Sequence, residues 1–177
     1  MAVLKLINPT TELHAAWLAS RDEWGGGVHQ PGSGLRSGDD TDSSAGFAAW
    51  VARLHREGDE SLPPPTGLVH AAYWWIVDQD DTVLGAISLR YALNDFLLQV
   101  AGHIGYSVRA SARGRGVAGW ALGEVLGVAR QRRFDAVLIT CDEDNDASAR
   151  VIEKHGGVLA DVRDTPGGPK RRYWIAL

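Results

Sequence analysis

The chain has 177 residues, 45% of them hydrophobic, and its 18 basic against 22 acidic residues give a formal net charge of −4. This length suits one compact domain with a substantial core, whereas the acidic balance argues against a general attraction to nucleic acid or to an anionic membrane. The single cysteine, Cys141, excludes an intrachain disulfide, and no apolar run suits a signal peptide or a membrane span, so we expect one cytoplasmic domain over residues 1–177.

The N-terminal third contains a predicted strand, a predicted helix and a long loop. Alternating apolar residues predict a strand over Met1 to Ile7. Thr10 or Thr11 caps the helix that follows, and an apolar stripe carries it to about Ser20. Over residues 25–46 the composition shifts to glycine, serine and aspartate, which predicts a flexible loop.

A second helix is predicted after this loop. Phe47, Val51 and Leu54 recur at helical spacing, and the pattern fades by Gly58. The triplet Pro63-Pro64-Pro65 then forces an extended connector, because proline fixes its backbone and lacks an N–H group.

The middle of the chain predicts three strands. Tyr73 to Val77 and Val83 to Tyr91 are expected to pair as an antiparallel hairpin around the turn Asp80-Asp81. Asn94 to Gly102 is ambiguous between a short helix and a strand and is treated as a connector. His103 to Val108 is the next predicted strand.

A glycine-punctuated turn follows that strand and leads into a helix that starts near Gly116. Gly114 and Gly116 permit positive φ, so that successive N–H groups can point one way. The unpaired amides and the dipole of the helix add to this effect. The turn is therefore predicted to be an anion cradle that suits a phosphate-bearing ligand.

The C-terminal third predicts a buried strand, a helix and two closing strands. The continuous apolar run Ala136 to Ile139 is typical of a strand that is covered on both faces, at the centre of a sheet. Ala147 to His155 is the next predicted helix, and Gly156-Gly157 ends it. Val158 to Val162 and Arg172 to Ala176 are the closing strands.

Two of these segments resemble the GNAT acetyltransferase superfamily. The turn carries Arg113-x-x-Gly116-x-Ala118, which is similar to motif A of that superfamily, and the later strand is followed by Asn145-x-x-Ser148, which is similar to motif B. The resemblance spans roughly Gly102 to Gly157. It implies an α+β, three-layer fold with a mixed central sheet of about six or seven strands flanked by helices. The alternative is an ordinary strand–turn–helix with a basic loop.

The resemblance implies acetyl-CoA as the co-substrate. In the superfamily the loop amides hold the pyrophosphate, while a strand backbone and the motif B asparagine bond the pantetheine arm. The coenzyme-binding residues implied here are Val108, Arg113, Gly114, Arg115, Gly116, Val117, Ala118, Asn145 and Ser148. Asn145 also suits a helix cap, and both roles can coexist. The Lys170-Arg171-Arg172 run is expected to be a solvated turn and strand entry, with binding of the adenosine 3′-phosphate as the alternative.

The candidate catalytic residues match the pattern of the superfamily less well than the coenzyme-binding residues do. His103 stands where many members carry a glutamate that accepts the amine proton, and its ordinary pKa near 6.5 suits a base; a hydrogen-bonded structural histidine is the alternative. Ile152 replaces the tyrosine that many members use to protonate the leaving thiolate. Tyr106, Tyr173 or water can serve instead, or no dedicated acid is needed. The six histidines lack metal-ligand spacing, so we predict no metal.

The implied activity is transfer of an acetyl group to a primary amine of a small molecule or peptide, by direct attack in a ternary complex. The net charge and the loop residues Trp24, Asp39, Asp40 and Asp42 favour a cationic acceptor; a merely solvated loop is the alternative. The alternative hypothesis for the function is a non-catalytic acyl-CoA-binding sensor or interaction module of the same fold. A homodimer is also possible. A Walker-type nucleotide site is disfavoured, since no Gly-Lys-Ser/Thr follows the turn.

Overall fold

The computed structural model describes residues 3–25 and 28–177, so the start of the predicted first strand and two glycines of the predicted flexible loop lie outside the described residues. Within that range seven strands form one mixed sheet in the order β1-β2-β3-β4-β5-β7-β6. The strands are β1 Lys5–Ile7, β2 Ala71–Val77, β3 Val83–Arg90, β4 Ile104–Val108, β5 Ala136–Asp142, β6 Val158–Arg163 and β7 Lys170–Ala176. The α-helices are α1 His14–Asp22, α2 Ser44–Gly58, α3 Val117–Gln131 and α4 Asp146–Lys154.

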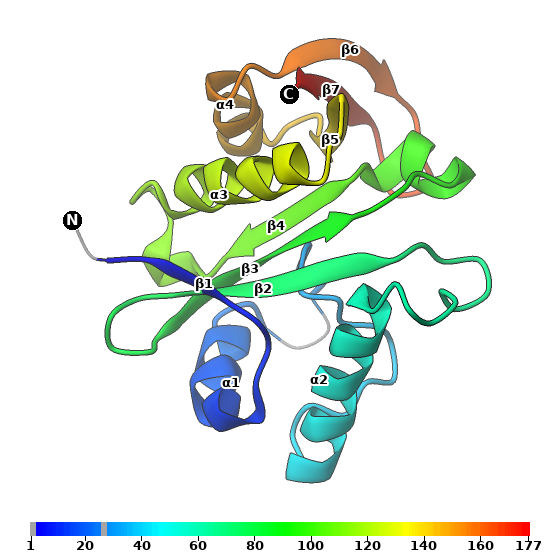
Figure 1. Ribbon diagram of the computed structural model, residues 1–177. Coiled ribbons are helices and arrows are strands. Elements are labelled where there is room, and N and C mark those ends of the chain that lie inside the picture. The colour runs from blue at the N-terminus through cyan, green and yellow to red at the C-terminus, as the bar shows by residue number, and fades with distance from the viewer. Residues whose placement is uncertain (1–2, 26–27) are drawn as a thin grey trace.

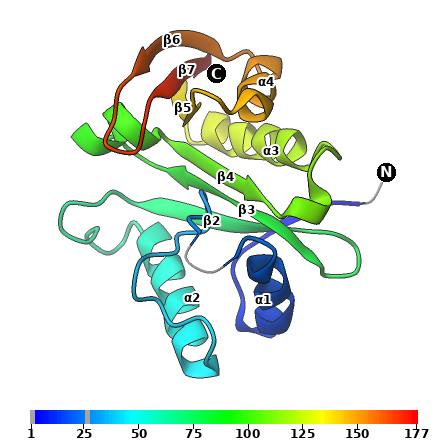
Figure 2. The same cartoon turned by 180° about the vertical axis from the view of Figure 1, so that it is seen from behind.

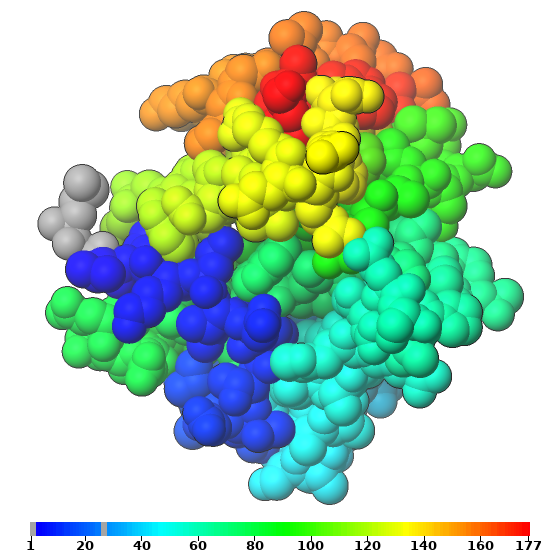
Figure 3. All heavy atoms as spheres, in the orientation of Figure 1, coloured from blue at the N-terminus to red at the C-terminus, as the bar shows by residue number. Residues whose placement is uncertain are grey.

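The molecule has three layers. Helices α3 and α4 cover one face of the sheet, and α1 and α2 cover the other (Figures 1 and 2). In the space-filling view the side chains of α1, in blue, and α2, in cyan, lie against each other below the strands (Figure 3). The predicted α+β, three-layer architecture is therefore confirmed. None of the described helices combines the length and the apolar character needed to cross a membrane.

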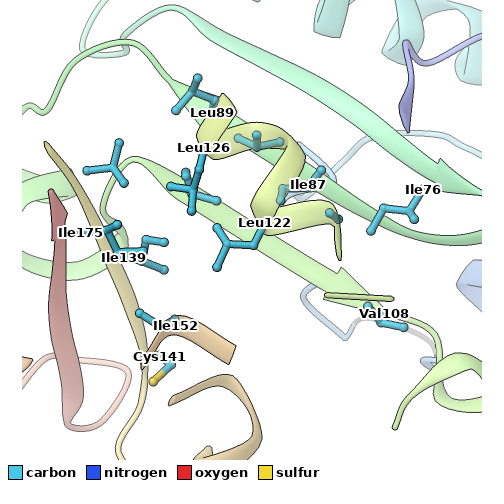
Figure 4. Close-up of a cluster of buried hydrophobic side chains, with 14 of the residues drawn as sticks. Ile76, Ile87, Leu89, Val108, Leu122, Leu126, Ile139, Cys141, Ile152 and Ile175 are labelled. Carbon is cyan, nitrogen blue, oxygen red and sulfur yellow. The ribbon is translucent and has the colours of Figure 1, made fainter. Parts of the chain in front are cut away.

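Helix α3 buries its apolar face on the sheet because its aliphatic residues recur every three or four positions. Leu122 and Leu126 are 0% and 1% exposed and point toward Ile87 and Leu89 of β3 and Ile139 of β5 (Figure 4). The apolar run of β5 lies between β4 and β7 and is buried on both faces, as predicted.

An aromatic cluster fills the opposite side of the sheet. Trp50 of α2 lies 4.7 Å from Trp17 of α1, 5.4 Å from Phe47 and 6.0 Å from Trp75 of β2, measured between ring centroids. All four side chains are at most 2% exposed. The cluster fixes α1 and α2 to the sheet, since buried aromatic pairs at these spacings add specific attraction to the burial of apolar area.

Most predicted elements are confirmed with shifts of a few residues. Helix α2 ends at Gly58 as predicted, and β2 and β3 form the predicted antiparallel hairpin, with Tyr73 opposite Ser88. The ambiguous connector contains a π-helical turn, Leu97–Ala101, and the Asn94 side chain accepts a 2.9 Å hydrogen bond from the Leu97 amide.

The prediction of a solvated basic run at the entry of β7 is wrong for Arg172. This side chain is 6% exposed, and its Nε and Nη2 donate to the two carboxylate oxygens of Asp161 at 2.6 and 2.8 Å. Its Nη1 donates to the Leu98 carbonyl at 2.6 Å. Lys170 and Arg171 pair with Asp142 and Asp146. Arg172 thus ties β6 and the π-helical turn to β7, which sequence spacing alone does not reveal.

Replacing Leu122 tests how much of the stability comes from α3. We expect Leu122→Ala to lower the free energy of unfolding by about 2–5 kcal/mol, because it leaves a cavity in a fully buried layer. Leu159→Ala, at a position 49% exposed on β6, is the control and should change that free energy by no more than about 0.5 kcal/mol. Urea unfolding followed by circular dichroism measures both; equal effects would contradict this view of the core.

Candidate functional site

The turn before α3 has the backbone geometry predicted for an anion cradle. Gly114 and Gly116 have φ of 71° and 80°, in the left-handed region that favours glycine. Gly116 is the N-cap of α3 and offers no side chain to its first amides. A Cβ built on either glycine meets no atom within 4 Å, so the turn is open to solvent. Unpaired N–H groups and the positive end of the α3 dipole therefore lie at an accessible surface.

Arg113 holds this turn in place. Its Nε donates to the Val108 carbonyl at 3.0 Å, and its guanidinium lies 4.8 Å from the centroid of the Trp24 ring. Arg115 is exposed. Arg113 and Arg115 were both predicted to bind the coenzyme, but their surroundings differ. Arg113 links the turn to both β4 and the end of α1, whereas Arg115 extends into solvent.

Glu23, just after α1, anchors the segment that leads from β4 into the turn. Its carboxylate accepts hydrogen bonds from the Ser111 amide at 2.9 Å, the Ser111 hydroxyl at 2.8 Å and Arg109 Nε at 2.8 Å. These bonds lower the pKa of Glu23 to about 2, with the Arg109 bond the largest cause. This contact is not predictable from local sequence patterns, because Glu23 and Arg109 are 86 positions apart.

A cavity of about 690 Å³ opens where β4 and β5 part. The two strands pair in parallel only at Ile104 and Ile139. Beyond that point the cavity lies between Gly105 and Tyr106 of β4 and the end of β5, and it continues along β2, β3 and residues 29–36. The gap therefore connects the α3–α4 side of the sheet with the α1–α2 side.

Along this gap the edge of β4 that faces β5 has no strand partner among the described residues. Arg109 N donates to Leu84 O, and Arg90 N donates to His103 O, so these alternate residues of the segment bond to β3. In an antiparallel ladder the intervening residues point their N–H and C=O groups the other way. Tyr106 and Val108 therefore direct backbone groups toward the gap, and the Val108 carbonyl bonds the Arg113 side chain there.

Tyr106, Ser148 and Asn145 meet at this gap. The Tyr106 hydroxyl lies 2.7 Å from Ser148 Oγ, and burial raises the pKa of Tyr106 to about 12. Asn145 Oδ1 accepts a 3.0 Å hydrogen bond from Ser148 N and so caps α4. The side-chain NH2 group of Asn145 stays able to donate to a ligand. All three residues line the cavity.

His103 is placed differently. It is 7% exposed, does not line the cavity, and its Nδ1 accepts a 2.9 Å hydrogen bond from the Leu138 amide. Burial and, secondarily, the charge of Arg90 lower the pKa of His103 to about 4. At neutral pH its proton is therefore on Nε2 and its one acceptor is occupied, which supports the structural alternative over the role of a base.

Tyr173 also lies away from the cavity. It is 1% exposed within the core, and its hydroxyl donates to Glu153 Oε1 at 3.2 Å. Ile152, where many family members have tyrosine, is fully buried in the same core. Of the two candidate tyrosines, only Tyr106 lines the cavity.

A polar group centred on Glu57, on the α2 side of the cavity, was not predicted from the sequence. Glu57 is 3% exposed; Arg36 and Arg53 donate to its Oε1 at 2.6 and 2.9 Å, and the Tyr73 hydroxyl donates to its Oε2 at 2.7 Å. The position of Glu57, three residues after Leu54 on the buried face of α2, was the available signal, but the packing of α2 against Tyr73 of β2 was needed to place it. Among the described residues no group of three or more His, Cys, Asp or Glu could hold a metal.

The aspartates predicted to select a cationic acceptor instead form ion pairs and hydrogen bonds with other residues of the chain. Asp39 pairs with Arg53, Asp42 pairs with Arg21, and Asp40 accepts hydrogen bonds from Ser43. None of the three lines the cavity. The structure gives no support to a site of negative charge formed by this loop.

The comparisons with known proteins agree with the fold. A family model described as an acetyltransferase (GNAT) domain matches residues 35–158. Solved structures with a similar fold include the microcin C7 self-immunity acetyltransferase MccE in complex with acetyl-CoA and AMP, which is 13% identical with a TM-score of 0.72 and 98% of this chain and 92% of that chain covered. RimJ of Mycobacterium smegmatis, in complex with a CoA disulfide, is 18% identical with a TM-score of 0.72 and coverage of 99% and 82%.

RimL, a ribosomal L7/L12 α-N-protein acetyltransferase in complex with coenzyme A, is 18% identical with a TM-score of 0.71 and coverage of 100% and 96%. A search of curated proteins found no match. At these identities the likeness to solved structures shows a shared fold.

The environment of His103 predicts a pH dependence of stability. The pKa of His103 is about 4 in the folded protein, below its ordinary value near 6.5, so the contribution of this histidine to the free energy of unfolding is fully present above pH 6.5. As the pH falls from 6.5 toward 4, the unfolded chain binds a proton that the folded protein does not, and the free energy of unfolding decreases by up to about 1.4 kcal/mol per pH unit. His103→Asn keeps an acceptor for the Leu138 amide and should remove this component. Urea unfolding of both proteins between pH 7.5 and 4.5 measures the difference, and parallel profiles would contradict the assignment.

Proposed function

The chain belongs to the GNAT acetyltransferase family, and we propose that it is an N-acetyltransferase that moves an acetyl group from acetyl-CoA to a primary amine of a small molecule or peptide. One observation carries the proposal: the unpaired edge of β4 leads from a cavity that crosses the sheet to an open cradle of backbone N–H groups. The acceptors of the similar solved structures do not identify the acceptor of this chain, because those structures are under 25% identical to it.

The residues of the cradle fit the phosphate part of acetyl-CoA. The turn from Arg113 to Ala118 offers positive-φ glycines, the first amides of α3 and the charge of Arg115 to the pyrophosphate. The edge of β4 offers backbone groups of Tyr106 and Val108 to the amide-containing pantetheine arm, and Asn145 and Ser148 approach it from α4.

The chemistry requires an acceptor amine without its proton and a route for a proton to the departing sulfur. Bound acetyl-CoA supplies a thioester, whose C–S bond breaks as the acceptor nitrogen forms a C–N bond to the acetyl carbon. The nitrogen then releases its proton to water in the cavity, and a proton passes to the thiolate of coenzyme A. Tyr106 is our candidate donor, because its hydroxyl is protonated at neutral pH and lies at the gap. The tyrosinate left behind, with a pKa of about 12, takes back the proton that the amine released to water, so the site is restored.

His103 is not assigned a chemical step, because its single acceptor nitrogen bonds the Leu138 amide. The His103→Asn variant is therefore expected to retain turnover at neutral pH. Loss of turnover in a folded variant would restore the prediction from sequence that His103 is the base.

The cradle is tested with two glycine variants that both place a side chain at a positive φ. Gly116→Val forces a β-branched residue into a positive-φ position and displaces the first amides of α3, so we expect acetyl-CoA affinity to fall at least about tenfold. Gly38→Val is the control, since Gly38 has a φ of 92° and open space around it but lies in the loop before α2, outside the turn that precedes α3. Each variant should lose about 1–2 kcal/mol of stability. Calorimetric titration with acetyl-CoA measures the difference; equal affinities would overturn the cradle.

The role of Tyr106 is tested against Tyr173. Tyr106→Phe should lower kcat about 10- to 100-fold with little change in the KM for acetyl-CoA, because only the proton donor is removed. Tyr173→Phe removes a hydroxyl that bonds the exposed Glu153, away from the cavity, and should affect stability alone. Release of the coenzyme A thiol in the presence of an amine panel gives both rates. A protein that binds acetyl-CoA but releases no thiol with any amine is a non-catalytic binding module, and that result would refute the proposed activity.

A further inference from the structure

The cavity contains a cation, Arg90, that has no counter-ion among the described residues. Ser88 and Arg90 lie two residues apart on β3 and therefore face the same side of the sheet, the side on which Tyr73 contacts α2. Both residues line the cavity. Within residues 3–25 and 28–177 the Arg90 side chain has one hydrogen bond, from Nη1 to the Gly102 carbonyl at 3.2 Å, and no carboxylate within 4.0 Å.

The acidic residues of the cavity are already neutralised. Glu57 is held by Arg36 and Arg53, and Asp142 pairs with Lys170. The charged lining therefore consists of two carboxylates with cationic partners and the guanidinium of Arg90. Burial lowers the pKa of Arg90, which shows that its charge is poorly solvated where it lies. An anionic group entering the cavity would complete the pairing.

Ser88 supplies a second, independent indication. Its side chain is 0% exposed, and its Oγ has no hydrogen-bond partner among the described residues. Buried hydroxyl groups are nearly always hydrogen-bonded, so an orphaned one at a cavity wall indicates a ligand atom or a water. A carboxylate accepts two hydrogen bonds from an arginine fork and another from a hydroxyl, and this donor set is what Arg90 and Ser88 offer.

We propose that the acceptor is an amine that also carries a carboxylate, as an amino acid does, and that Arg90 and Ser88 bind this carboxylate. The inference rests on the proposed acetyl transfer and names its substrate class. It replaces the cationic acceptor expected from the net charge of −4, because the charge at the cavity wall, rather than the charge of the whole chain, faces the ligand.

The test compares each of a set of amino acids with its carboxamide. Removing the carboxylate makes the amine less basic, so the intrinsic reactivity of the amine favours the carboxamide. Any preference for the amino acid therefore comes from binding. We expect at least one amino acid to be acetylated with a kcat/KM at least tenfold above that of its amide. Equal rates for every pair, or faster reaction of the amides, would overturn the inference.

Variants connect the preference to the two residues. Arg90→Gln keeps a donor for the Gly102 carbonyl but removes the charge, and it should reduce the acid-over-amide ratio to near one; Ser88→Ala should reduce it partly. Arg130→Gln removes a charge from the exposed last turn of α3 and should leave the ratio unchanged. A ratio that survives in Arg90→Gln would overturn the assignment.

Two further measurements separate this inference from the proposed function. Acetyl-CoA affinity, measured by calorimetry, should be the same in Arg90→Gln and the parent; a loss would place Arg90 in the coenzyme site and overturn the inference. If no amine is acetylated, the proposed transfer fails, and thermal shift with the same amino acids and amides then decides the binding question. Stabilisation by an acid but not by its amide, lost in Arg90→Gln, supports the carboxylate site, and its absence refutes it.

Discussion

The site depends on the point at which β4 and β5 stop pairing. A parallel pair in the centre of a sheet normally continues over several residues, and here it is limited to Ile104 and Ile139. Beyond it the backbone polar groups of β4 must find other partners, because buried N–H and C=O groups are costly when unpaired. Arg113 satisfies one of them at Val108, and the others face a cavity large enough for a ligand. An interruption of the sheet thus becomes a binding surface.

Local signals were sufficient to predict most of the elements. The glycines of the cradle were identified from their spacing after a strand, and both adopt positive φ. Helix α2 and the β2–β3 hairpin followed from periodicity and turn residues. The cavity was not predictable in the same way, because it depends on register: Tyr73 faces Ser88 only through the pairing of two strands, and Glu57 reaches Tyr73 only through the packing of α2.

His103 shows why residue type and position in a motif do not settle a role. Its ordinary pKa suits a base, but its burial beneath Phe134 and Trp174 and its bond from the Leu138 amide change its chemistry. The hydrogen bond reaches across from β5, 35 residues away in the sequence. Long-range contacts of this kind are also what distinguish the buried Arg172 from the solvated strand entry that its neighbours Lys170 and Arg171 suggested.

The distribution of buried charge explains how one cavity serves both sides of the sheet. On the α3–α4 side the gap presents uncharged donors, the backbone of β4 and the hydroxyls of Tyr106 and Ser148. On the α1–α2 side it presents Arg90, whose charge has no carboxylate partner in residues 3–25 and 28–177, because Glu57 is already shared by two other arginines. A buried cation without a partner destabilises the unliganded protein, and an anion that binds beside it removes that cost. The buried charge of Arg90, which lowers the stability of the unliganded protein, is therefore also the feature best suited to select a ligand.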